Sequence, residues 1–160
     1  MNYVEFGGTE ESTIAEVHEW ILDNLEDGVV CPACSQYARM YKRSLNSGMA
    51  RDLIMLYGKY GMQLAHTGRD VFMDQSRGLS KLRFWGLTQM GDSRGFWQVT
   101  PAGKAFLQNQ LRVPKVIWTY NQRMIKVDRD TEINVIGALH NKFNYNELMG
   151  GSDGLPSTGT

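Results

Sequence analysis

The sequence has no uninterrupted apolar stretch of 18 residues, which argues against a membrane-spanning helix. It contains only two cysteines in 160 residues, and its first residues are acidic and polar rather than typical of a secretory signal. A protein with these features does not resemble a disulfide-stabilised secreted domain. We therefore expect a single packed domain in the cytoplasm.

The motifs of several enzyme classes are also missing. The chain contains neither a phosphate-binding G-x-x-x-x-G-K-[ST] loop nor the H-E-x-x-H motif of zinc proteases. Its three histidines lie in unrelated sequence contexts, and many carboxylates crowd the first predicted helix, where we expect them to be solvated. We predict that the protein is not an enzyme.

The formal net charge is zero, but the charges are unevenly distributed along the chain. Residues 1–34 contain eight acidic residues and no lysine or arginine, whereas residues 35–126 contain fifteen basic residues and four aspartates. A basic segment of this kind favours a polyanionic partner. The acidic segment could equally neutralise the basic one on the surface, and charge alone does not separate the two interpretations.

Residues 80–107 predict the end of a helix, a short hairpin and the start of another helix. We expect the first of these helices to run from about residue 75 to 85 and to end at Gly86, which can adopt a positive φ. Two short strands rich in aromatic and β-branched residues follow, joined by a glycine-containing turn. Thr100 then supplies a hydroxyl N-cap, and Pro101 suits the first position of the next helix.

Further elements are predicted on both sides of this segment. Thr13 and Glu16 form a capping box at the start of the first helix. The expected elements are a helix over 13–27, a hairpin or knuckle after it, a helix over 47–60, a connector over 62–74, a hairpin over 113–127 that turns near Asn121, a helix over 131–140 and one more turn in FNYNELM. Residues 150–160 have no apolar pattern and are expected to be disordered.

The region around the predicted hairpin resembles the winged helix-turn-helix regulators of bacteria, archaea and their viruses. The matching residues are Leu82, Gly86, Leu87, Val99, Thr100, Pro101, Gly103, Lys104, Phe106 and Leu107. The longer combination of CPAC, LRFWGL and GFWQVTPAGKAF resembles small proteins of bacteriophages and bacteria. The resemblance implies an α+β fold in one domain, residues 1–149. Its winged helix-turn-helix core of about residues 47–110 would carry an N-terminal helix, a CxxC knuckle and a C-terminal β-hairpin plus helix.

In winged helices, the helix before the hairpin is often the one that enters a DNA groove, with the hairpin beside it. The residues expected to contact DNA are Arg77, Ser80, Lys81 and Arg83 on the helix and Arg94 at the hairpin tip. Arginine and lysine pair with phosphates or guanine edges, and serine with either. We predict non-catalytic binding of double-stranded DNA by a small phage or mobile-element transcriptional regulator, acting in the host cytoplasm if it comes from a phage. Phe84, expected to be exposed on the same helix face, is the feature that fits this function least.

The alternative is a winged-helix module for protein–protein interaction, such as a phage inhibitor or adaptor that acts on a host protein. The acidic first helix would then be the working surface. The sequence is compatible with a homodimer in either case.

Cys31-Pro-Ala-Cys34 has the spacing of a zinc knuckle, in which a tight turn places two thiolates on one metal ion. A tetrahedral site needs two more ligands, for which we consider His18, expected to point inward from the first helix, and His66 in the connector. These residues predict one structural zinc ion. Two free cysteines and a core histidine are the alternative interpretation.

Overall fold

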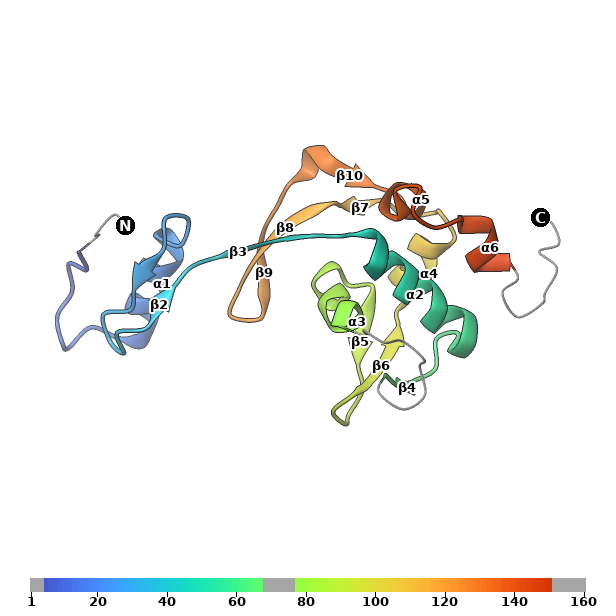
Figure 1. The fold of residues 1–160 in the computed structure, drawn as a ribbon. Coiled ribbons are helices and arrows are strands. Elements are labelled where there is room, and N and C mark those ends of the chain that lie inside the picture. The colour runs from blue at the N-terminus through green and yellow to red at the C-terminus, as the bar shows by residue number, and fades with distance from the viewer. Residues whose placement is uncertain (1–4, 68–76, 151–160) are drawn as a thin grey trace.

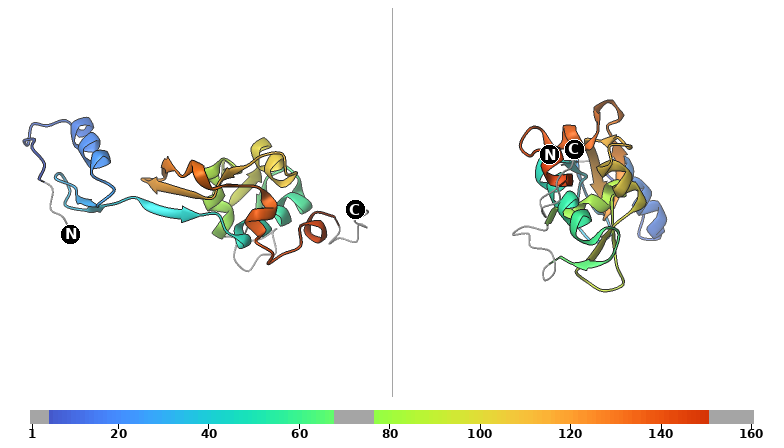
Figure 2. Two further views of the ribbon diagram at one scale, coloured as in Figure 1. Left: turned by 90° about the horizontal axis from the view of Figure 1, so that it is seen from above. Right: turned by 90° about the vertical axis from the view of Figure 1, so that its right-hand side faces the viewer.

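The computed structural model describes residues 5–67 and 77–150 and shows a mixed α and β fold, as predicted. Figure 1 shows an N-terminal unit, a central three-stranded sheet and a larger body, in which helices pack on a second three-stranded sheet at the lower edge of the view. Strand β3 (Tyr41–Ser44) leads from the N-terminal unit to the body, and the views in Figure 2 show the same succession. In the described part of the chain, no helix has the length and apolar character needed to cross a membrane.

The N-terminal unit consists of α1 (Ile14–Asp23), β1 (Val29–Val30) and β2 (Tyr37–Ala38). Its predicted capping box is confirmed, because the Thr13 hydroxyl accepts a hydrogen bond from the Glu16 backbone while the Glu16 carboxylate accepts one from the Thr13 backbone. The helix ends earlier than predicted, at Asp23. Three buried residues form the small core of the unit: Ile21, Leu25 and Val29.

The central sheet has the strand order β3-β8-β9 and is antiparallel throughout. Strands β8 (Val116–Tyr120) and β9 (Arg123–Val127) form the predicted hairpin. Asn121 and Gln122 join them with φ angles of 49° and 64°, which is the conformation that matches a tight hairpin to the twist of its strands. The hairpin therefore places polar residues at the end of the sheet.

The body begins with α2 (Ser47–Tyr60), which has the predicted bounds. Strands β4 (Ala65–His66), β5 (Thr88–Met90) and β6 (Phe96–Val99) then form an antiparallel sheet with β6 in the middle. The sequence predicts only a connector over residues 62–74. The structure has strand β4 within this segment, so the prediction is corrected there. A strand of two residues is too short to leave a periodic pattern.

Helix α3 (Arg77–Lys81) continues into the 3-10 helix η1 (Leu82–Trp85), and Gly86 ends it with a φ of 74°. The predicted start of this helix at residue 75 lies outside the described residues. Helix α4 (Pro101–Leu107) begins as predicted, because the Thr100 hydroxyl accepts a hydrogen bond of 3.0 Å from the Gly103 backbone. The elements are held together by buried residues that include Leu53, Ile54, Leu79, Leu82, Leu87, Val99 and Phe106.

The C-terminal segment contains β7 (Val113–Pro114), η2 (Arg129–Thr131), β10 (Glu132–Ile133), α5 (Val135–Leu139) and α6 (Tyr145–Gly150). The predicted helix over 131–140 begins later than expected. Asn134 is the N-cap, because its side chain accepts a hydrogen bond of 2.8 Å from the Gly137 backbone. Residues 151–160, nearly all of the tail that we expect to be disordered, lie outside the described residues.

Candidate nucleic-acid interface

The predicted hairpin is formed by β5 and β6, with Met90 paired to Trp97. Trp97 is buried and its neighbour Phe96 is half-buried. Arg94 is exposed in the turn between the strands. The next residue, Gly95, has a φ of 90°, which favours glycine. The turn thus presents the arginine to solvent.

Helix α3 places the predicted contact residues in different environments. Lys81 is exposed, Ser80 is half-buried, and Arg77 is the first residue of the helix. The helix packs closely on α2, since a Cβ at Gly78 would lie 3.0 Å from Met49 Cγ. This close approach fixes α3 against the body. Lys81, the last residue of α3, is exposed to solvent.

A buried carboxyl group lies at the same contact between α2 and α3. Asp52 is only 7% exposed, and one of its carboxylate oxygens would lie 3.2 Å from a Cβ at Gly78. Burial raises the pKa of Asp52 to about 6, which the positive charge of Arg51 partly opposes. A carboxyl group that is protonated more readily than usual therefore lies in the contact between α2 and α3.

Phe84 is half-buried, and the expectation that it is exposed is wrong. The guanidinium carbons of Arg43 and Arg83 lie 5.1 Å and 4.9 Å from the centre of its ring. Arg83 also donates a hydrogen bond from Nη2 to Oε1 of Gln122 in the β8–β9 turn. The half-buried Arg83 therefore connects η1 to the central sheet, in addition to carrying charge near α3.

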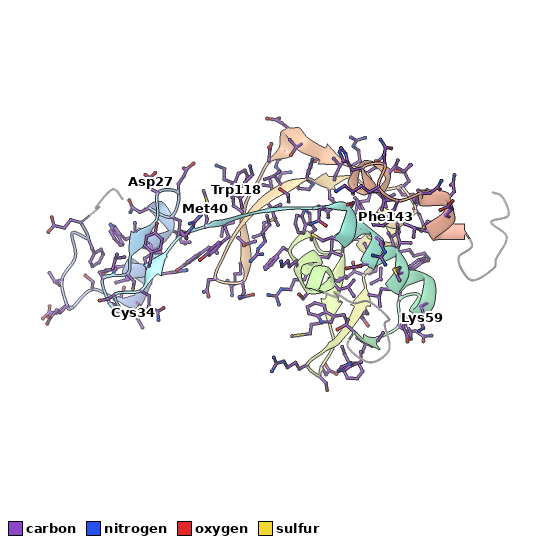
Figure 3. The ribbon with its side chains drawn as sticks, viewed as in Figure 1. Asp27, Cys34, Met40, Lys59, Trp118 and Phe143 are labelled. Carbon is purple, nitrogen blue, oxygen red and sulfur yellow. The ribbon has the colours of Figure 1, made fainter. Side chains whose placement is uncertain are left out.

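A second group of basic residues lies across the central sheet. The strand register places Lys42, Trp118 and Lys126 in one row, and the Lys126 ammonium lies 4.8 Å from the Trp118 ring centre. Lys126 also forms an exposed ion pair of 3.7 Å with Glu26 of the N-terminal unit. Figure 3 shows Trp118 on the central sheet, between the N-terminal unit and the body. Trp118 is half-buried, and the strand register brings it to the two lysines.

The β5–β6 turn, Gly91-Asp92-Ser93-Arg94-Gly95, also fits the G-x-S-x-G pattern of a nucleophile elbow. In such an elbow the serine lies on a sharp turn from a strand to a helix. Here the turn joins two antiparallel strands. The structure does not form an elbow at Ser93.

The four residues considered for zinc are not brought together. Cys31 and Cys34 lie within 3.5 Å of each other in the turn between β1 and β2. His18 is exposed on α1 rather than pointing inward, and its ring stacks on Tyr120 with 6.4 Å between centres. His66 lies on β4 of the body, edge-on to Phe96. Within residues 5–67 and 77–150, no three or more histidine, cysteine or carboxylate side chains gather as a metal-binding group.

Comparison of the chain with family models, with curated proteins and with solved structures gives no match.

Proposed function

We propose that the protein binds double-stranded DNA through a winged helix, without catalysis, as a small transcriptional regulator of a phage or mobile element. The observation that carries this proposal is the order α2, β4, α3 with η1, β5, β6 combined with the sheet order β4-β6-β5. A helix followed by a hairpin that pairs with one earlier strand is a feature that winged-helix domains share. The first helix of a helix-turn-helix would fall between β4 and α3, where residues 68–76 lie outside the described residues. Figure 1 shows α3 near the hairpin and facing the β8–β9 turn.

The charges around α3 support DNA as the partner. Lys81 is exposed on α3 and Arg94 in the β5–β6 turn, and Arg77 and Ser80 belong to the same helix as Lys81. Exposed basic groups of this kind bind phosphates and so position a protein on the duplex. We assign Arg83 a positioning role as well, because its guanidinium group holds η1 to the β8–β9 turn.

The test is binding of a fluorescent duplex of mixed sequence by the double variant Lys81→Ala/Arg94→Ala. Each phosphate contact contributes roughly 0.9 to the slope of log affinity against log salt. Loss of two contacts is therefore expected to reduce this slope by about 2 and to weaken binding at low salt. Lys142→Ala is the matched control, because this exposed lysine follows α5 in another part of the body. Equal affinity of the double variant and the control would refute the proposed interface.

Binding to another protein is the second candidate function, and α1 is the feature that favours it. Ile14 is 88% exposed and Leu22 41% exposed on a helix that also carries Glu16 and Glu19. Exposed apolar side chains among acidic ones suit a basic protein partner. If the chain does not bind DNA at low salt, this function replaces the first.

A further inference from the structure

The Cys31–Cys34 turn has a well-defined local geometry in the N-terminal unit. The Cys31 backbone donates a hydrogen bond of 2.8 Å to the Gln36 carbonyl, and the Ser35 backbone donates one of 2.9 Å to the Cys31 carbonyl. Ser35 has a φ of 66°, an uncommon conformation for a residue with a side chain. These contacts close the turn and hold both cysteines on the same side of the β1–β2 hairpin.

The two thiols are close enough to bind one metal ion, because Cys31 and Cys34 lie within 3.5 Å of each other in this turn. Cysteine binds metals through its sulfur after loss of the thiol proton. Cys34 is exposed, so a metal ion can reach the pair from solvent.

This chain cannot complete a four-thiolate site alone. It has two cysteines in total, whereas a structural zinc ion is almost always held by four ligands. Its histidines make other contacts: His18 stacks on Tyr120, His66 lies against Phe96, and His140 ends α5. Within residues 5–67 and 77–150 no third metal-binding side chain joins the two cysteines. A second molecule or a rearrangement of α1 would therefore supply the remaining ligands.

We propose that two copies of the chain share one zinc ion through Cys31 and Cys34 of each copy. A two-fold axis through the metal would give each subunit the same contacts, which is the commonest symmetry of protein dimers. The position of the pair suits this arrangement, because Figure 3 shows Cys34 at the lower edge of the N-terminal unit, away from the body. Four thiolates then surround the ion, and their thiol protons are released to solvent. This inference does not depend on DNA binding.

The test is zinc uptake by the full chain under reducing conditions, measured together with its mass in solution. We expect one zinc ion per two chains, a dimer with zinc and a monomer after chelation. Cobalt in place of zinc should give the intense thiolate charge-transfer absorption of a four-sulfur site. Cys34→Ser should abolish metal uptake and dimer formation, whereas His18→Ala and His66→Ala should leave both unchanged.

Three results would overturn the proposal. One zinc ion per monomer that is lost in His18→Ala would indicate a site within one chain. No uptake of zinc or cobalt by the reduced chain would exclude a metal site at the turn. If oxidation then forms a disulfide between Cys31 and Cys34, the pair has a redox role and not a metal-binding one. A wild-type dimer that persists after the metal has been removed by chelation would also contradict the proposal. This measurement does not depend on whether Cys34→Ser folds.

Discussion

Gly103 provides the sharpest test of how α4 packs on the β5–β6 sheet. A Cβ at this position would lie 2.2 Å from the Leu87 carbonyl oxygen and 2.8 Å from Val99 Cγ1, well inside the 3.4–4 Å of ordinary contact. The Val99 side chain can adjust, but the Leu87 carbonyl belongs to the backbone and accepts a hydrogen bond from the Thr100 backbone at 3.1 Å. Overpacking of this kind costs roughly 1–3 kcal/mol. The approach of 2.2 Å to a backbone atom places the cost at the upper end of this range, about 3 kcal/mol. Since alanine gains up to about 1 kcal/mol over glycine in a helix, we expect Gly103→Ala to lower the free energy of unfolding by about 2 kcal/mol.

Urea unfolding followed by circular dichroism measures this loss. Gly58→Ala is the matched control, because this exposed glycine lies in α2 and a Cβ there meets nothing within 4 Å. The control should gain about 0.5–1 kcal/mol from helix propensity, so the two variants should differ by roughly 3 kcal/mol. If Gly103→Ala is as stable as Gly58→Ala, α4 does not approach Leu87 as closely as described.

Three further substitutions test local parts of the structure. The pKa of Asp52 is about 6 in the folded state and about 3.9 in the unfolded state, so the folded state binds the proton more tightly. The free energy of unfolding should therefore fall by about 2 kcal/mol as the pH rises from 4 to 6. Asp52→Asn should remove this decrease in the free energy of unfolding, which urea unfolding at several pH values measures. If the variant has the same pH profile as the wild type, Asp52 is not the cause of the decrease. Thr100→Ala removes the cap of α4 and should cost about 1 kcal/mol of unfolding free energy; a loss below a few tenths would exclude the cap. Phe84→Leu keeps an apolar side chain but removes the ring beneath two guanidinium groups, and a melting temperature equal to that of wild type would contradict the expected loss of about 1 kcal/mol.

Local sequence signals predicted the ends of several elements. Gly86, Thr100 and Pro101 act through bonds and torsions within a few residues, so their effects are readable without the rest of the fold. The same holds for the capping box at Thr13 and for the turn at Asn121. These signals accounted for the hairpin and for the start or end of the helices beside it.

Burial was harder to predict, because it depends on contacts between distant segments. Phe84 is half-buried because Arg43, on a strand 41 positions earlier in the chain, lies over its ring. His18 lies on a helix whose unit has only a small core, so the apolar pattern around it does not imply an inward side chain. The row of Lys42, Trp118 and Lys126 likewise exists only through strand register. The hairpin and the helix of the candidate interface could therefore be predicted from the sequence, whereas the pairing of Lys42 with Trp118 and of Trp118 with Lys126 could not.

The salt dependence of DNA binding by the unmodified protein tests the central proposal most directly. Affinity for a mixed-sequence duplex should be measured between about 50 and 200 mM salt. The proposal predicts measurable binding at the low end and a linear fall of log affinity against log salt, with a slope that shows several phosphate contacts. No binding at the lowest salt, or binding that does not change with salt, would contradict it.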